Sequence, residues 1–205
     1  MSTLNMYQSL LMMSLLTVTP YIINAEEDTK TVINIYSITT SFSVGEELKR
    51  GHQMAIDQTN NNHSILSDYY LNFTVLHSGD DSTQALLHAL EISYDNTEEI
   101  NNDNLSVTVP IVLGCDWSSL STVTAPTLSA FEWAQISSSS TSVILSETSS
   151  FRYFYRSVPS DSLQAQSLIY LCESFDWTEI GIIHVNDNYG VYLAVSISEL
   201  ATSKV

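Results

Sequence analysis

Two hydroxyl-rich turns carry the residue types in this sequence that best suit binding chemistry. One contains Ser118 and Ser119, the other contains Ser139 and Thr141, and each follows a short apolar run. Hydroxyl groups donate hydrogen bonds, and the first N–H groups of a helix attract anions. The two turns therefore predict a seat for one carboxylate. The same residue types also suit a helix N-cap at Ser118 or Ser119 and a solvated serine loop, and the sequence leaves these alternatives open.

An acid and an aromatic residue lie downstream of these turns. The run Asp161-Ser162-Leu163-Gln164 fits a capping box, with the acid at the N-cap and the glutamine at N3. Tyr189 precedes a glycine and suits a turn residue whose ring packs on a sheet. By residue type alone, a structural role is the default for both Asp161 and Tyr189.

Sequence motifs typical of enzymes are missing. The chain has no GxSxG, P-loop, HExxH or GxGxxG motif, and its five histidines are isolated from one another. The two cysteines and the histidines are too scattered to indicate a metal site by spacing. We therefore expect no enzymatic activity, no catalytic residue, no metal ion and no cofactor.

The charge balance excludes one class of partner. Six Lys and Arg residues against 23 Asp and Glu residues give a formal net charge of -17. A polyanion of this kind is repelled by phosphate backbones and by anionic membrane surfaces, which excludes nucleic acid as a partner. The length of 205 residues suits one domain, or one and part of another, and 44% hydrophobic residues suffice for a core.

The N-terminal segment is typical of a secretory signal. Residues 7–23 are mostly apolar and uncharged, and Ala25 provides a small residue for cleavage, so we expect a signal peptide over residues 1–25. Because no Lys or Arg precedes the apolar stretch, a retained signal anchor is the alternative. Three sequons favour secretion and predict glycosylation at Asn62, Asn72 and Asn104.

After this segment, short β-branched or aromatic runs alternate with longer helical patterns, which is typical of βαβ units and a parallel sheet. The acidic, Asn-rich stretch 95–106 reads as a loop. We expect strands at 31–38, 69–76, 110–114, 134–137 and 179–185, an extended segment at 151–158, and helices at 45–60, 82–94, 118–131, 161–175 and from 189 onward.

A set of separated motifs resembles the extracellular ligand-binding region of class C G-protein-coupled receptors. The resemblance is to metabotropic glutamate receptors and, through Gly114-Cys115 and the SSLST stretch, to GABA type B receptors. It covers about residues 110–190 and more weakly 45–90. The motifs are Gln135-Ile136-Ser137, Arg156-Ser157-Val158-Pro159-Ser160-Asp161, Gln164-Ala165-Gln166, Phe175-Asp176-Trp177 and Asn188-Tyr189-Gly190. It implies an α/β fold of the type I periplasmic-binding kind, with two hinged lobes that are each a doubly wound parallel sheet.

The resemblance also implies ligand-binding roles. Ser118, beside Ser119, matches the serine that holds the α-carboxylate of the ligand, and Ser139 and Thr141 match the second hydroxyl turn. The other two matches are Asp161, at the acid that pairs with the α-amino group, and Tyr189, at the tyrosine that packs over the ligand.

Two departures from the family pattern stand out. The stretch His77 to Asp81 has no cysteine, so Cys115 lacks its usual partner, and Cys172 is expected too far away to replace it. The basic residue that reads a glutamate side chain is not clearly present, because Lys49 and Arg50 lie only near that position.

The sequence predicts ligand-binding lobe one over residues 26–158 and the truncated beginning of lobe two over residues 159–205. The expected function is capture of a small amino-acid ligand, glutamate- or GABA-like, outside the plasma membrane. The expected partners are this ligand and a second receptor subunit in a homo- or heterodimer, with a membrane contact only through a domain missing from this chain. The alternatives are a soluble solute-binding protein for a transporter and a dimerisation or decoy fragment that binds no ligand.

Overall fold

The computed structural model describes residues 30–100 and 110–203. Contacts divide the chain into two units, Met1–Lys30 and Thr31–Val205, and the fold described below is that of the second unit. The signal-peptide prediction and the sequon at Asn104 lie outside the described residues. No helix in the described part of the chain is long and apolar enough to cross a membrane.

Five parallel strands form one sheet in the order β2-β1-β3-β4-β5. Strand β1 is an interior strand, paired with β2 on one side and β3 on the other. Its β-branched residues suit a strand that is covered on both faces. The strands are β1 (Thr31–Thr39), β2 (Tyr69–His77), β3 (Ile111–Gly114), β4 (Ala134–Ser137) and β5 (Phe154–Arg156). The fold is α/β with the parallel sheet expected of the type I periplasmic-binding fold.

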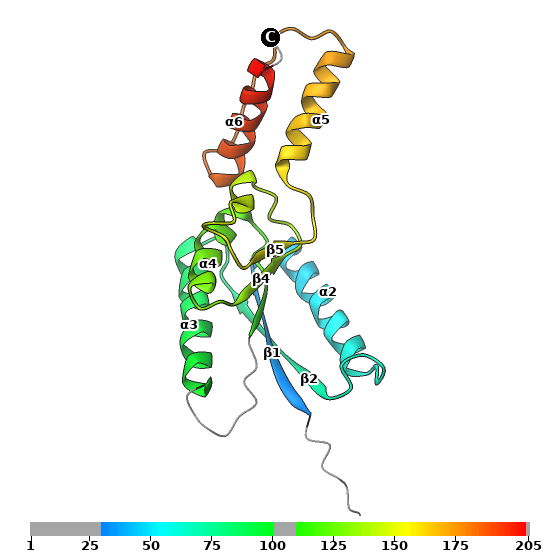
Figure 1. Ribbon diagram of the computed structural model, residues 1–205, viewed down its shortest axis with the longest axis vertical. Coiled ribbons are helices and arrows are strands. Elements are labelled where there is room, and N and C mark those ends of the chain that lie inside the picture. The colour runs from blue at the N-terminus through cyan, green and yellow to red at the C-terminus, as the bar shows by residue number, and fades with distance from the viewer. Residues whose placement is uncertain (1–29, 101–109, 204–205) are drawn as a thin grey trace, which may run out of the picture. The chain divides into compact units, whose positions relative to one another are not determined.

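Helices cover both faces of this sheet (Figure 1). Helix α2 (Ser43–Asn60) lies on one face, and α3 (Ser82–Ile100) and α4 (Ser118–Ala130) pack against each other on the other face. The face on which each helix lies follows from the topology. The chain passes from β1 to β2 in one direction across the sheet, and from β2 to β3 and on to β4 in the opposite direction. Right-handed crossovers in opposite directions place their helices on opposite faces.

The main core lies between the sheet and the α3–α4 pair. Ile38 of β1 and Val112 of β3 are fully buried against Ala85 and Ala89, whose small side chains let α3 approach the strands. The other buried members of this cluster are Ile92, Cys115, Leu120, Leu128 and Trp133. Burying each large apolar side chain contributes roughly 1.5–3 kcal/mol, so this face stabilises the end of the sheet where the hydroxyl turns lie.

The reversal of strand order brings the backbones of β1 and β3 very close together. Gly114 ends β3 with φ at +108°, and a Cβ atom there would lie 2.3 Å from the carbonyl oxygen of Ile38. Only glycine tolerates this combination of conformation and contact. The reversal point is also where ligands of open α/β sheets bind, outside the carboxyl ends of the strands.

A second, smaller apolar cluster joins the two C-terminal helices. Helix α5 (Asp161–Ser174) packs on α6 (Asn188–Ser203) through Ala165, Ile169 and Ile197. The assignment of residues 159–205 to a second lobe stays a prediction.

Two sequence expectations about secondary structure are wrong. Residues 179–185 are exposed and form no strand, because a parallel strand needs a neighbour for its backbone hydrogen bonds and this stretch has none within residues 110–203. The loop expected at 95–106 is helical over 95–100, where α3 continues, and its remainder lies outside the described residues. A polar composition indicates solvent exposure and does not stop a helix from extending.

The other expected elements are confirmed to within two residues at each end, apart from the end of the helix expected at 82–94 and the segment 151–158. Only Phe154–Arg156 of that segment forms a strand. A short 3-10 helix, η1 (Val143–Ser146), precedes it.

Candidate functional site

The serine-rich segment after β4, Ser137–Ser142, is a buried hydroxyl loop and not a solvated one. Ser137, Ser140 and Ser142 are fully buried. The Ser137 hydroxyl donates to the Cys115 carbonyl oxygen at 2.8 Å and accepts from the backbone N–H of Ser140 at 2.9 Å. These bonds tie the loop to the end of β3, so the alternative of a solvated serine loop is wrong for Ser137–Ser142. Buried hydroxyls are stable here because they are hydrogen-bonded.

Ser118 is the first residue of α4, and its side chain points to the hydroxyl loop. The N-cap of α4 is Trp117, which makes no side-chain cap. The hydroxyl of Ser118 accepts a hydrogen bond from the backbone N–H of Ser142 at 3.1 Å, and Ser118 is 4% exposed. The N-cap alternative is therefore wrong for Ser118. A helix start without a side-chain cap leaves N–H groups available to an anion.

Asp161 begins α5 beside the same loop. The N-cap is Ser160, whose hydroxyl accepts from the backbone N–H of Ser162, so the capping box expected at Asp161 is wrong. The backbone N–H of Asp161 donates to the Thr141 carbonyl oxygen at 2.9 Å. Asp161 is 2% exposed, and its Oδ2 is one of two buried side-chain polar atoms without a hydrogen-bond partner in the described part of the chain. The acid is thus free of the capping role.

Burial raises the pKa of the Asp161 carboxyl, and the hydrogen bond from the Thr141 hydroxyl and the charge of Arg156 offset part of this rise. Arg156 does not form an ion pair with Asp161. Its guanidinium instead donates to the carbonyl oxygens of Ser142 at 2.9 Å and Ser140 at 3.4 Å, and to the Ser146 hydroxyl. The sequence analysis assigned no role to Arg156. Its position shortly before the Pro159–Asp161 motif could have indicated that it lies near the site.

The remaining expected residues border this arrangement to different degrees. The hydroxyl of Ser139 donates to the Asp116 carbonyl oxygen at 2.6 Å, and Ser119 follows Ser118 in the first turn of α4. Tyr189 is 38% exposed, near the start of α6. Its neighbour Asn188 reaches the loop, because the backbone oxygen of Asn188 accepts from the Ser142 hydroxyl at 3.1 Å.

Sequence reasoning missed an acid beside the hydroxyl turns. Asp116 follows β3, is 5% exposed and accepts hydrogen bonds from both the backbone N–H and the hydroxyl of Thr40. Its Oδ1 is the second buried polar atom without a hydrogen-bond partner within the described ranges. A carboxylate directly after a buried strand is a signal that could have revealed it.

A buried glutamine braces the floor of the site. Gln135 of β4 is fully buried, and its amide nitrogen donates to the Gly114 carbonyl oxygen at 2.9 Å. Its amide oxygen accepts from the Thr124 hydroxyl at 3.0 Å. The ends of β3 and β4 and the helix between them are therefore linked by hydrogen bonds, and such a network fixes geometry because each broken bond strands a buried polar group.

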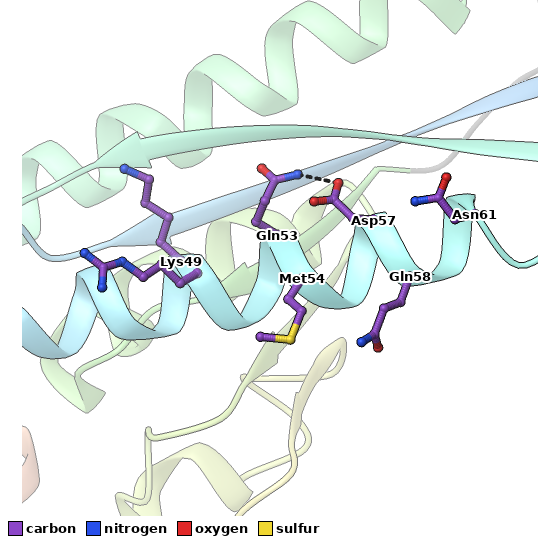
Figure 2. Close-up of a pocket in the computed structure, with 7 residues that line it drawn as sticks. Lys49, Gln53, Met54, Asp57, Gln58 and Asn61 are labelled. Carbon is purple, nitrogen blue, oxygen red and sulfur yellow. Dashed lines mark hydrogen bonds between the residues drawn. The ribbon is translucent and has the colours of Figure 1, made fainter.

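Two hollows elsewhere in the molecule contain none of the expected site residues. One, of about 610 Å³, lies along α2 (Figure 2). In it the Gln53 side-chain amide donates a hydrogen bond to the Asp57 carboxylate at 2.9 Å. Lys49 and Arg50 line this hollow. The other, of about 380 Å³, lies between α5, α6 and the segment that follows α5.

Both cysteines are free thiols. Burial raises the pKa of Cys115 to about 12, so this thiol is protonated and unreactive at neutral pH. Cys172 is partly buried on α5. Within residues 30–100 and 110–203, no three His, Cys, Asp or Glu side chains come together as metal ligands.

Two of the three sequons lie on the described surface. Asn62 is exposed just beyond α2, and Asn72 is exposed on β2, where its amide donates to the Asn34 side chain at 3.0 Å. Their exposure suits a glycan acceptor, and glycosylation itself stays a prediction.

Residues 48–204 match the family described as the receptor family ligand binding region. The chain belongs to this family. Among its relatives are a probable metabotropic glutamate receptor of Caenorhabditis elegans, 28% identical over 165 residues, and the human taste receptor type 1 member 1, 27% identical over 164 residues. These alignments cover 73% and 78% of this chain, and 16% and 20% of the relatives.

The human extracellular calcium-sensing receptor is 29% identical over 143 residues, covering 66% of this chain and 13% of the receptor. The chain thus spans at most about a fifth of the length of these relatives. The class C resemblance is confirmed at the level of the receptor family ligand binding region. The likeness to GABA type B receptors stays a prediction.

Proposed function

We propose that this chain is the ligand-binding module of a class C-type receptor and captures a small ligand of amino-acid type. Glutamate and GABA are the first compounds to test. The proposal is supported by family membership and by the convergence of a helix start, buried hydroxyls and a buried acid at the carboxyl ends of the strands. The names of the relatives are those of receptors, which favours a binding role over an enzymatic one.

The ligand carboxylate would bind at the start of α4. The first N–H groups of a helix carry partial positive charge, and the Ser118 hydroxyl, which accepts from the backbone N–H of Ser142, would donate its own hydrogen near them. Ser139 and Thr141 would border the carboxylate, because their hydroxyls donate to the Asp116 carbonyl oxygen and to the Asp161 carboxyl. Ser119 contributes its N–H in the same turn. In a protein with a net charge of -17, such local dipoles must hold an anion, because the overall field repels it.

The ligand ammonium would bind Asp161, and the ring of Tyr189 would cover it. One observation carries this assignment: Oδ2 of Asp161 is buried and has no hydrogen-bond partner within the described residues. A buried carboxylate oxygen without a donor is unfavourable by itself, since desolvation raises the pKa of Asp161. An ammonium group bound at this oxygen would offset the desolvation cost of the carboxylate. That gain would add to the free energy of ligand binding.

A receptor role places the site on the extracellular side of the plasma membrane or in a secreted protein. The predicted signal segment and the relative named as an extracellular calcium-sensing receptor support this location. Closure of a second lobe over the ligand would then shift a receptor dimer toward its active state. Its membrane domain would belong to a longer protein.

Calorimetric titration with glutamate, GABA and the common amino acids tests the proposal. We expect at least one α-amino acid to bind, and Asp161→Asn to weaken its affinity at least thirtyfold, because truncating a buried charge pair costs about 2–5 kcal/mol. The matched control is Asp81→Asn, because Asp81 is exposed and caps α3 by accepting from the backbone N–H of Thr83 at 2.8 Å.

The two variants should separate binding from stability. Asp81→Asn should leave affinity unchanged and lower the free energy of unfolding slightly, since it weakens a cap. Asp161→Asn should leave stability unchanged or improved, because the carboxylate it removes is poorly solvated. Silence across the whole panel, or unchanged affinity in Asp161→Asn, would contradict the proposal.

A further inference from the structure

The loop after β3 carries an acid that the proposed carboxylate and ammonium sites do not use. Asp116 is 5% exposed, and its Oδ2 accepts from the backbone N–H of Thr40 at 2.8 Å and from the Thr40 hydroxyl at 2.9 Å. Thr40 directly follows β1, so the carboxylate bridges the two strands at which the order of the sheet reverses. Oδ1 of Asp116 is buried there without a hydrogen-bond partner in the described part of the chain.

Two aromatic rings bridge the same two loops. Phe42 lies two residues beyond Thr40, and Trp117 follows Asp116, and their ring centroids are 6.4 Å apart at an interplanar angle of 31°. Phe42 is 50% exposed and Trp117 is 44% exposed, so each ring leaves a large part of its surface open to solvent. The face of an aromatic ring attracts a cation. An acid and two open rings thus lie together at the reversal point.

The charge of Asp116 is not neutralised by a basic residue. Among the described residues, Lys49 forms an ion pair with Glu46, and His88 contacts Glu91 at 3.3 Å, but no Lys or Arg side chain lies within 4.0 Å of the Asp116 carboxylate. His52 on α2 and His77 at the end of β2 act on Asp116 through their charge.

The two histidines offset the burial of this carboxyl only in part. Burial lowers the pKa of His52 below its usual 6.5, so His52 is mostly uncharged at pH 7. Burial raises the pKa of Asp116, and the hydrogen bonds from Thr40 and the charges of His52 and His77 lower it only in part.

We propose that Asp116, Phe42 and Trp117 bind a positively charged group at the far end of the ligand, so that the site prefers a basic amino acid to glutamate. The inference rests on the proposed function, since Asp161 and the hydroxyl loop must hold the α-ammonium and α-carboxylate first. Asp116 Oδ1 then accepts from the distal ammonium or guanidinium, and the two rings cover its alkyl stem and charge. The repulsion of a second ligand carboxylate by Asp116 disfavours glutamate.

L-Lysine and L-norleucine form a matched pair of probes, because they have the same backbone and carbon chain and differ in the terminal ammonium. Calorimetry on the full chain, expressed in a secreting eukaryotic host and titrated at pH 7.5, should show at least about tenfold tighter binding of lysine. L-Glutamate should bind more weakly than norleucine. Norleucine binding equal to or tighter than lysine binding would overturn the inference and leave the proposed function intact, whereas no binding of any amino acid would overturn both.

Asp116→Asn tests the role of the charge with little change of shape. The asparagine oxygen can still accept from Thr40, so the loops stay joined. We expect lysine affinity to fall at least about tenfold and norleucine affinity to change less than about twofold. An equal loss for both ligands would show that Asp116 only braces the loops, and would overturn the inference.

A second variant protects the test against misfolding of Asp116→Asn. Trp117→Leu removes an exposed ring, and the ratio of lysine to norleucine affinity should fall at least about threefold. The control is Phe131→Leu, because Phe131 is 41% exposed at the far end of α4 and contacts Trp133. It should leave the ratio unchanged, and an unchanged ratio in Trp117→Leu as well would contradict the role of the rings.

Discussion

The carboxyl edge of the sheet and the α5–α6 pair are built on opposite principles. At the edge, buried polar groups of Ser137, Ser140 and Gln135 are held by hydrogen bonds that cross between strands. The α5–α6 pair is held by buried Ala165, Ile169 and Ile197, with Leu193, Leu200 and Ala201 partly buried against them, and this region leaves many large apolar side chains exposed. The exposed ones on the two helices and the segment between them are Leu163, Leu168, Tyr170, Leu171, Phe175, Trp177, Ile180, Ile182, Ile183, Val185, Tyr189 and Val195.

The comparison teaches that a strand depends on its neighbours more than on its own composition. The four residues of β3 form a strand because β1 and β4 pair with them on both sides. The longer and equally apolar run 179–185 forms none, since no described strand pairs with it. The edge of the sheet should therefore be rigid and intolerant of change, and the α5–α6 region should be tolerant outside its buried residues.

Gly114→Ala, at the carboxyl edge of the sheet, should destabilise the protein more than the other substitutions considered below. Its Cβ would lie 2.3 Å from the Ile38 carbonyl oxygen at a φ of +108°, and neither strand can move without disturbing the sheet. We expect the free energy of unfolding, measured in urea, to fall by about 3 kcal/mol or more.

Two other glycines serve as references for that measurement. At Gly190 in α6 an added Cβ would lie 2.4 Å from the Val185 carbonyl oxygen, but the segment before α6 belongs to no sheet and can shift. Gly190→Ala should therefore cost clearly less than Gly114→Ala. Gly51→Ala meets no atom within 4 Å in α2 and should stabilise the protein by about 0.5–1 kcal/mol. Equal losses at Gly114 and Gly190 would contradict the contrast between the two regions.

Substitutions in the α5–α6 region should test whether only its buried residues contribute to stability. Ile169→Ala removes a 5% exposed side chain from the three-residue cluster and should lower the free energy of unfolding by about 2 kcal/mol or more. Ile183→Ser changes a fully exposed residue and should alter it by less than about 0.5 kcal/mol. Thermal and urea unfolding of both variants would check this, and a large loss in Ile183→Ser would show that residue 183 contributes to a core.

The pH dependence of stability should give the smallest effect, and it belongs to the sheet edge. Burial raises the pKa of Asp116 and Asp161 above the unfolded value near 3.8, so the folded state binds more protons than the unfolded state between the two pKa values. The contribution of these two carboxyls to stability therefore decreases as pH rises through that window and is constant above it. Urea unfolding between pH 3.5 and 7 should show a shallower decrease in Asp116→Asn than in the parent, and an unchanged slope would contradict the direction of the shift.

Much of the fold could be predicted because it depends on local signals. The β-branched runs of β1 and β2 and the helical periodicity of α2 are readable in the sequence within two residues of their observed ends. The length of α3 and the missing strand at 179–185 could not be predicted, because helix extension and strand pairing depend on groups distant in the sequence.

The site could be predicted in part for the same reason. Ser118 and Asp161 stand out by residue type and by family likeness, yet their freedom from capping depends on the neighbours Trp117 and Ser160. The burial of the hydroxyl loop and the bridge from Asp116 to Thr40 arise from contacts between separate strands. Those contacts join residues that are far apart in the sequence, so local sequence patterns do not predict them.

The inward orientation of Arg156 has a consequence for the response of the protein to ionic strength. This guanidinium is one of only six Lys and Arg side chains against 23 acids, and it is occupied with carbonyl oxygens of the hydroxyl loop. The surface therefore has a large excess of like charges, which repel one another over a Debye length of about 10 Å at 0.1 M salt. Added sodium chloride screens this repulsion and has few ion pairs to weaken, so the folded state becomes more stable as the salt concentration rises.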